Sequence, residues 1–156
     1  MRTAFVIFNV GDSLFGIDIQ KIVSIEKVSE ITNLPQIPEY IQGIINIRGS
    51  IVPVIDSPKL LFNQNIQINE NTRFILTDVN QLTFALMVPR ANEILDIDTE
   101  LIKPVNLMAS SVDLLEGTVL QGGRIISIIN LESLFSSILH LDTVRSEIAK
   151  ITVPNS

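Results

Sequence analysis

The sequence contains no cysteine, no tryptophan and a single histidine, His140. The missing thiols exclude disulfides, thiolate nucleophiles and cysteine-bound zinc or iron–sulfur clusters. Basic residues are also scarce, because 11 Lys and Arg oppose 17 Asp and Glu and leave a formal net charge of −6. An acidic chain has the wrong sign for phosphate backbones and anionic lipid surfaces. The composition therefore disfavours nucleic acid and membrane surfaces as partners.

Long hydrophobic runs are absent as well, and none approaches the roughly 20 residues that a membrane-spanning helix needs. The apolar stretch Ala4–Phe8 meets Asn9 at once, and no small-residue cleavage site of a secretory signal follows it. We therefore expect a cytoplasmic protein without direct membrane insertion. Apolar residues make up 46% of the chain and the mean hydropathy is +0.40, which excludes disorder.

Short runs rich in Ile, Leu and Val, separated by turn residues, predict β-strands. Residues 5–10 and 14–19 flank a Gly-Asp-Ser turn and predict one hairpin. Residues 43–48 and 51–56 flank Gly49-Ser50 and predict a second hairpin. Gly49 would supply the positive φ that this second turn requires.

Two helical segments complete the pattern. Ser57 as N-cap and Pro58 at the first helical position predict a short helix. Asn130 is expected to cap a longer helix, whose apolar residues repeat at helical spacing as far as Leu141. Residues 63–71 are polar and rich in Asn and Gln, which indicates a linker.

Two blocks of the first half of the sequence recur in the second half. An offset of 69 (74 − 5) places residues 5–10 on residues 74–79, with Phe on Phe. An offset of 74 (117 − 43) places Gly43 on Gly117, and an insertion of five residues (74 − 69) accounts for the difference. We interpret the match as an internal repeat, against the alternative of chance agreement among Ile- and Val-rich strands.

A repeat of about five strands per copy predicts a mainly β fold built from two tandem five-stranded β-barrels. The first barrel is expected in residues 4–62 and the second in residues 72–136, followed by a helical tail over 137–156. Exchange of strands between the barrels is left open. The length suits one compact domain or two very small ones, and we expect residues 1–156 to form a single domain.

The sequence offers no pattern for catalysis or for cofactor binding. His140 lies at the polar end of the expected C-terminal helix, where a solvated or packing role is expected rather than acid–base chemistry. The segment Gln121–Arg124 contains two glycines between two strands, which fits a hairpin turn better than a phosphate-binding loop. We therefore expect no enzyme activity and no cofactor.

The acidic triplet Asp96-x-Asp98-x-Glu100 resembles the start of a calcium-binding loop. Such a loop needs glycine at its sixth position and an acid at its twelfth. Leu101 and Leu107 stand at these positions, so no metal site is expected. A solvated turn after the preceding strand is the preferred interpretation.

The segment from Ile37 to Asp56 is similar to the signature of CheW-type chemotaxis coupling proteins. Its centre reads Gly43-Ile-Ile-Asn-Ile-Arg-Gly49 and continues to Pro53-Val-Ile-Asp56. The family pattern is the same in outline: glycine, two apolar residues and Asn-Leu-Arg-Gly, followed by proline, two apolar residues and aspartate. The resemblance covers about residues 4–136.

This resemblance implies a fold of two SH3-like β-barrels and the role of a non-catalytic adaptor in a two-component signalling pathway. Members of the family link the regulatory domain of a CheA-type histidine kinase to the cytoplasmic tips of methyl-accepting chemoreceptors in membrane arrays. Contacts between barrels build rings, so self-association is a further expectation. The alternative is a divergent CheW-like scaffold that self-associates or binds a small ligand without kinase coupling.

Several partner-binding residues follow from the resemblance, position by position. Asn46, Arg48 and Gly49 occupy the Asn-Leu-Arg-Gly hairpin, whose arginine is associated with coupling to receptor and kinase. An arginine at a strand end offers five donors in a fixed fork. The alternative is a surface arginine paired with a nearby carboxylate such as Glu26. Ile22 falls on an apolar position lining the receptor groove, and core packing explains it equally well.

Leu107 and Met108 lie in an irregular stretch and are interpreted as an exposed apolar contact for a partner. Ser24, also assigned to partner binding, departs from the family pattern, because many relatives carry a glutamate there, close to the signature arginine. Further departures are Ser57-Pro58, where relatives usually continue with Leu, and Pro89, which replaces Asp and removes a strand donor. We expect these departures to affect the choice of partner rather than the fold.

Overall fold

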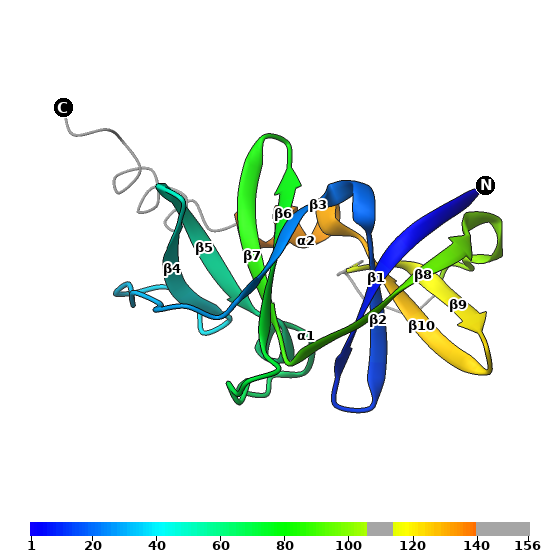
Figure 1. The fold of residues 1–156 in the computed structure, drawn as a ribbon, viewed down its shortest axis with the longest axis horizontal. Coiled ribbons are helices and arrows are strands. Elements are labelled where there is room, and N and C mark those ends of the chain that lie inside the picture. Colours follow the sequence, from blue (N-terminus) through cyan, green and yellow to red (C-terminus); the bar gives the residue numbers. More distant parts are fainter. Residues whose placement is uncertain (106–113, 140–156) are drawn as a thin grey trace.

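The computed structural model describes residues 1–105 and 114–139, with only the backbone described for residues 137–139. Within these ranges the chain forms two five-stranded sheets and a few short helices (Figure 1). The strands are β1 (Arg2–Val10), β2 (Ser13–Asp18), β3 (Ile22–Lys27), β4 (Ile41–Ile47), β5 (Ser50–Asp56), β6 (Arg73–Val79), β7 (Leu82–Val88), β8 (Arg90–Asp98), β9 (Leu115–Gln121) and β10 (Arg124–Ile129). The helices are the 3₁₀ helices η1 (Ile19–Lys21) and η2 (Thr99–Leu101) and the α-helices α1 (Ser57–Phe62) and α2 (Leu131–Leu139).

The two sheets have equivalent strand orders. Sheet A has the order β8-β1-β2-β10-β9, and sheet B has the order β3-β6-β7-β5-β4. Exchanging each strand for its counterpart in the repeat, β1 for β6, β2 for β7, β3 for β8, β4 for β9 and β5 for β10, converts one order into the other. The expected fold class, mainly β with two five-stranded SH3-like units and short helices, is confirmed.

The sheets do not follow the two halves of the sequence. Sheet A combines β1 and β2 with β8, β9 and β10, whereas sheet B combines β3, β4 and β5 with β6 and β7. The ranges 4–62 and 72–136 therefore contain the two copies of the repeat, but neither range builds a sheet alone. Each of the parallel pairs β2–β10 and β5–β7 joins a strand of the first half to a strand of the second half. Parallel neighbours need a long connection, and the sequence between the two strands supplies it. The barrels are interleaved rather than tandem.

Three apolar cores hold this arrangement together. The core of sheet A contains Phe5, Ile7, Ile97, Val119, Ile126 and Ile128. The core of sheet B contains Ile45, Val52, Val54, Phe74, Leu76, Ala85 and Met87. A third core, here called the inter-sheet core, takes residues from both sheets and from α2, including Val6, Phe8, Ile75, Phe84, Leu134 and Phe135. Strands β1 and β6 face two cores at once, which explains why both read as continuous apolar runs.

The matched glycines Gly43 and Gly117 lie inside strands β4 and β9. A Cβ on Gly43 would stand 2.1 Å from the carbonyl oxygen of Thr32, and a Cβ on Gly117 would stand 2.3 Å from that of Lys103. Each of these two loop residues forms a β-bridge with the strand residue that follows the glycine. The same close backbone approach in both sheets therefore explains why glycine recurs.

Helix α1 begins one residue earlier than the sequence indicates. Asp56 is its N-cap, and its carboxylate accepts a hydrogen bond from the backbone N–H of Lys59 at 3.0 Å. The prediction of Ser57 as the cap is wrong, because its hydroxyl donates instead to the carbonyl of Met87 at 2.8 Å. Pro58 still lies in the first turn, where its missing N–H costs nothing.

Helix α2 begins as expected, because the Asn130 side chain accepts a hydrogen bond from the backbone N–H of Ser133 at 3.1 Å. Its residues Leu134 and Phe135 are buried in the inter-sheet core. The helical tail was expected over residues 137–156. Its part beyond Leu139, including His140 and the predicted continuation to Leu141, lies outside the described residues. Among the helices described, none has the length and apolar character needed to cross a bilayer.

Candidate functional site

The edge strands β3 and β8 carry apolar side chains that continue the inter-sheet core to the surface. Ile25 of β3 is 41% exposed and pairs across the sheet with Ile75, a residue of that core. Ile94 of β8 is 59% exposed and pairs in the same way with Val6. Paired residues on antiparallel strands point to the same face. We call Ile25 with the neighbouring exposed Val23, and Ile94, the apolar edges of the two sheets.

Ile22 lies at the start of β3, directly before Val23. Its side chain is half-buried and packs against the inter-sheet core. The packing interpretation of Ile22 therefore has direct structural support, and a contact with a partner remains a prediction.

Arg48 and Gly49 form the turn between β4 and β5, with φ of 49° and 90°. The prediction that Arg48 ends a strand is therefore wrong. Asn46 stabilises the turn, because its side-chain oxygen accepts a hydrogen bond from the N–H of Gly49 at 2.9 Å. The counterparts in the β9–β10 turn are both glycines, Gly122 and Gly123, with φ of 58° and 78°. Arg48 thus adopts a left-handed conformation that costs a residue with a side chain about 1–2 kcal/mol.

The Arg48 guanidinium pairs with Glu26 of β3, as the alternative interpretation of the sequence expects. The distance from Nη2 to Oε2 is 3.2 Å, and the Arg48 side chain is 67% exposed. The pKa of Glu26 lies below its ordinary value, first because of the Ser24 hydroxyl beside it and then because of Arg48. Ser24 Oγ is buried, and no well-aligned hydrogen bond joins it to another residue within the described ranges. Ser24, Glu26 and Arg48 therefore form one polar site, where β3 meets the β4–β5 turn.

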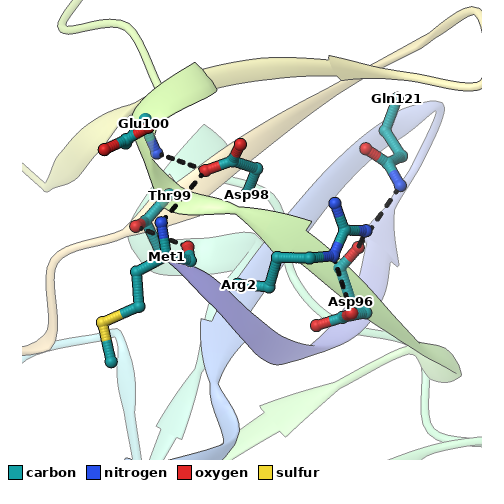
Figure 2. Close-up of polar contacts among 7 residues, drawn as sticks. All are labelled: Met1, Arg2, Asp96, Asp98, Thr99, Glu100 and Gln121. Carbon is teal, nitrogen blue, oxygen red and sulfur yellow. Dashed lines mark hydrogen bonds and ion pairs between the residues drawn. The ribbon is translucent and has the colours of Figure 1, made fainter.

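A second ion pair joins the corresponding elements of sheet A. Arg124 of β10 donates to Glu93 of β8, with 2.7 Å between Nη2 and Oε1. Gln121 of β9 also reaches β8, because its side-chain Nε2 lies 3.5 Å from the backbone carbonyl oxygen of Asp96 (Figure 2). In both sheets, therefore, an arginine of one hairpin reaches the edge strand on the opposite side. We call these two arginine–glutamate contacts the closing ion pairs.

The acidic triplet forms hydrogen bonds with its own backbone and with the N-terminal residues, and it does not form the expected turn. Strand β8 runs to Asp98, and η2 places Glu100 in a 3₁₀ helix, which corrects the expected solvated turn. Arg2 Nε lies 2.9 Å from Asp96 Oδ2, and the backbone N–H of Glu100 donates to Asp98 Oδ1 at 3.0 Å (Figure 2). That backbone hydrogen bond is the main cause that lowers the pKa of Asp98. In the part of the chain that the structure describes, no three acidic or histidine side chains are grouped as metal ligands would be.

A third polar contact lies at the junction of the sheets and α2. Lys21 of η1 places its ammonium 2.6 Å from Oε1 of Glu132, at the start of α2, and this hydrogen bond is the main cause that lowers the pKa of Glu132. Burial raises the pKa of the nearby Glu116. Sequence reasoning missed this cluster, because 111 positions separate Lys21 from Glu132 and no local pattern relates them.

The predicted partner-binding residues are therefore distributed unevenly. Ser24, Asn46, Arg48 and Gly49 meet at one end of sheet B, and Ile22 lies on the same strand as Ser24. Leu107 and Met108 lie outside the described residues.

Comparison with known proteins gives a consistent result. The model of the CheW-like domain family matches residues 4–139 of the chain. The chemotaxis protein CheW of Klebsiella aerogenes is 31% identical over 135 residues, which span 85% of this chain and 81% of that protein. The chemotaxis protein CheW of Bacillus subtilis is 29% identical over 127 residues, 80% of this chain and 81% of that one. The crystal structure of the scaffolding protein TtCheW from Thermoanaerobacter tengcongensis superimposes with a TM-score of 0.77 at 31% identity, covering 84% of this chain and 86% of the other.

Proposed function

The chain belongs to the CheW-like family, and from this membership we propose that it is a non-catalytic adaptor coupling chemoreceptors to a CheA-type histidine kinase. Its named relatives are chemotaxis proteins, and a solved relative is described as a scaffolding protein. The proposal places the chain in the cytoplasm, recruited to receptor arrays at the membrane. Self-association within such an array is part of the same proposal.

The observation that carries the proposal is the pair of apolar edges. Ile25 and Ile94 extend the inter-sheet core to the surface, so a partner that covers them removes apolar area from water. Full burial of an isoleucine contributes about 1.5–3 kcal/mol, so covering a half-exposed one contributes about 1 kcal/mol. The two side chains and Val23 together supply about 3 kcal/mol, which corresponds to more than a hundredfold in affinity.

Arg48 supplies a separate polar contact at the β4–β5 turn. A charge-assisted hydrogen bond that a partner partly shields from water contributes about 1.5–3 kcal/mol. The hydrogen bond between Asn46 and Gly49 stabilises the turn that contains Arg48. Ser24 lies beside Glu26, the residue with which Arg48 forms its ion pair. Leu107 and Met108 remain predicted apolar contacts.

The test measures dissociation constants for a purified CheA-type kinase and for a cytoplasmic chemoreceptor fragment, both from the source organism. Ile94→Asp and Ile25→Asp are each expected to weaken binding at least tenfold. Ile68→Asp is the matched control for Ile94→Asp, because Ile68 is 52% exposed in the segment between α1 and β6, outside both sheets. Equal losses in all three variants, or no binding by the wild type, would contradict the proposal.

One observation favours a second candidate function, self-association without kinase coupling. Leu120 and Ile125 are both exposed and lie directly opposite each other on the β9–β10 hairpin. Sedimentation equilibrium of the wild type and of Leu120→Asp tests this candidate. A dimer that the substitution abolishes, in a chain that binds neither kinase nor receptor, supports it; a monomeric wild type rejects it.

A further inference from the structure

The position of Arg48 is not required by the closing ion pair that it forms. In sheet A the equivalent contact is made by Arg124 from strand β10, while two glycines take the positive φ values of the turn. In sheet B the arginine itself occupies the turn at φ 49°, where glycine would be less strained. Closing the sheet therefore does not explain why an arginine stands at this position.

The guanidinium of Arg48 is the more open of the two. Its side chain is 67% exposed, against 45% for Arg124, and its contact with glutamate is longer, 3.2 Å against 2.7 Å. An arginine carries five N–H donors, and within the described residues a single contact, to Glu26, engages this one. Most of the fork therefore faces water and can meet another acceptor.

Glu26 holds the place that an external carboxylate would take. It is half-buried on β3, and the neighbouring Ser24 hydroxyl stabilises its charged form together with Arg48. The ion pair is a single contact of 3.2 Å to a largely exposed guanidinium, so the carboxylate of Glu26 can release Arg48 at little cost.

We propose that Glu26 is an internal competitor, which occupies Arg48 in the free protein and yields it to an acidic side chain of the partner protein. The inference rests on the proposed adaptor function and adds to it the chemistry of the partner, a carboxylate on a protein segment. Binding exchanges one ion pair for another, so the net gain is smaller than an unoccupied arginine would give.

The test compares affinities for the same kinase and receptor fragment by biolayer interferometry. Glu26→Gln keeps the shape of the side chain and removes its charge, so it is expected to bind roughly twofold to fivefold more tightly, the range that an exposed ion pair spans. Arg48→Ala is expected to bind at least tenfold more weakly. The double variant is expected to bind as Arg48→Ala does, since the competitor then has nothing to occupy. Glu93→Gln, in the closing ion pair of sheet A, is the matched control and should bind like the wild type.

Each other outcome overturns the inference in a recognisable way. Weaker binding by Glu26→Gln would mean that Glu26 positions Arg48 for its partner. Tighter binding by Glu93→Gln as well would indicate a general effect of net charge. Wild-type affinity in Arg48→Ala would refute the carboxylate contact and leave the adaptor function intact. No binding by any variant would overturn the adaptor function and this inference together. Arg48→Lys, which keeps the charge without the fork, replaces Arg48→Ala if that variant does not fold.

Discussion

Replacing Arg48 by glycine is expected to separate folding from binding. Because the residue adopts φ 49° in the β4–β5 turn, glycine removes a left-handed conformational cost of about 1–2 kcal/mol. The substitution also removes an exposed ion pair worth about 0–1 kcal/mol and adds about 0.5–1 kcal/mol of chain entropy to the unfolded state. These terms nearly cancel, so the free energy of unfolding should stay within about 1 kcal/mol of the wild type.

Arg48→Ala gives the sharper comparison. Alanine loses the same ion pair but keeps the left-handed cost, so the glycine variant should be the more stable of the two by about 1 kcal/mol. Ser50 supplies the control, since it lies in strand β5 of the same hairpin and has no positive φ. There the usual order should return, with Ser50→Ala more stable than Ser50→Gly.

Urea unfolding followed by circular dichroism measures the order of stability of the glycine and alanine variants at both positions. Both Arg48 variants are expected to bind the kinase and the receptor fragment at least tenfold more weakly than the wild type. An alanine variant more stable than the glycine variant would refute the assigned turn geometry. A loss of several kcal/mol in both, with binding intact, would make Arg48 a structural residue and move the coupling role to the apolar edges.

Three further predictions concern the fold. Gly43→Ala and Gly117→Ala should each lower the free energy of unfolding in urea by at least about 2 kcal/mol, because the added Cβ collides with a loop carbonyl and breaks its bridge; a smaller loss in one of them would break the equivalence of the sheets. Phe135→Ala should cost about 3–5 kcal/mol by calorimetry, and a loss below 2 kcal/mol would remove Phe135 from the inter-sheet core. Lys21 lowers the pKa of Glu132 below its ordinary 4.5, so this pair stabilises the protein above that pH and the contribution disappears as the pH falls through the lowered pKa. The wild type and Glu132→Gln should therefore converge in stability in acid, and a constant difference would contradict the pair.

The strands and their internal repeat could be predicted from the sequence. Alternation and turn residues are visible within a few positions, the repeat is visible as two fixed offsets of 69 and 74 residues, and the strands that they predict are present. The pairing of β2 with β10 and of β5 with β7 could not be predicted, since each joins segments far apart in the chain. Without these pairs, assigning each barrel to one half of the sequence was the simplest interpretation.

The candidate site, too, could be predicted from the sequence only in part. The pairing of Arg48 with Glu26 was accessible as one of two alternatives, because a cation in an acidic chain attracts a nearby carboxylate. The placement of Arg48 inside the turn was not, since a two-residue turn usually reserves positive φ for glycine or asparagine. The competition between Asp56 and Ser57 for the cap of α1 was also hidden, because it depends on the distant carbonyl of Met87.

The most direct test of the adaptor function is a sedimentation assay with membranes that contain the chemoreceptor. CheA-type kinase is mixed with these membranes, with and without the chain, and the fraction of kinase in the pellet is measured as the chain is titrated in. An adaptor should carry the kinase into the pellet in proportion to the chain added, and Arg48→Gly should shift this titration to at least tenfold higher concentration. Kinase that sediments equally well without the chain, or never sediments with it, would contradict the adaptor function.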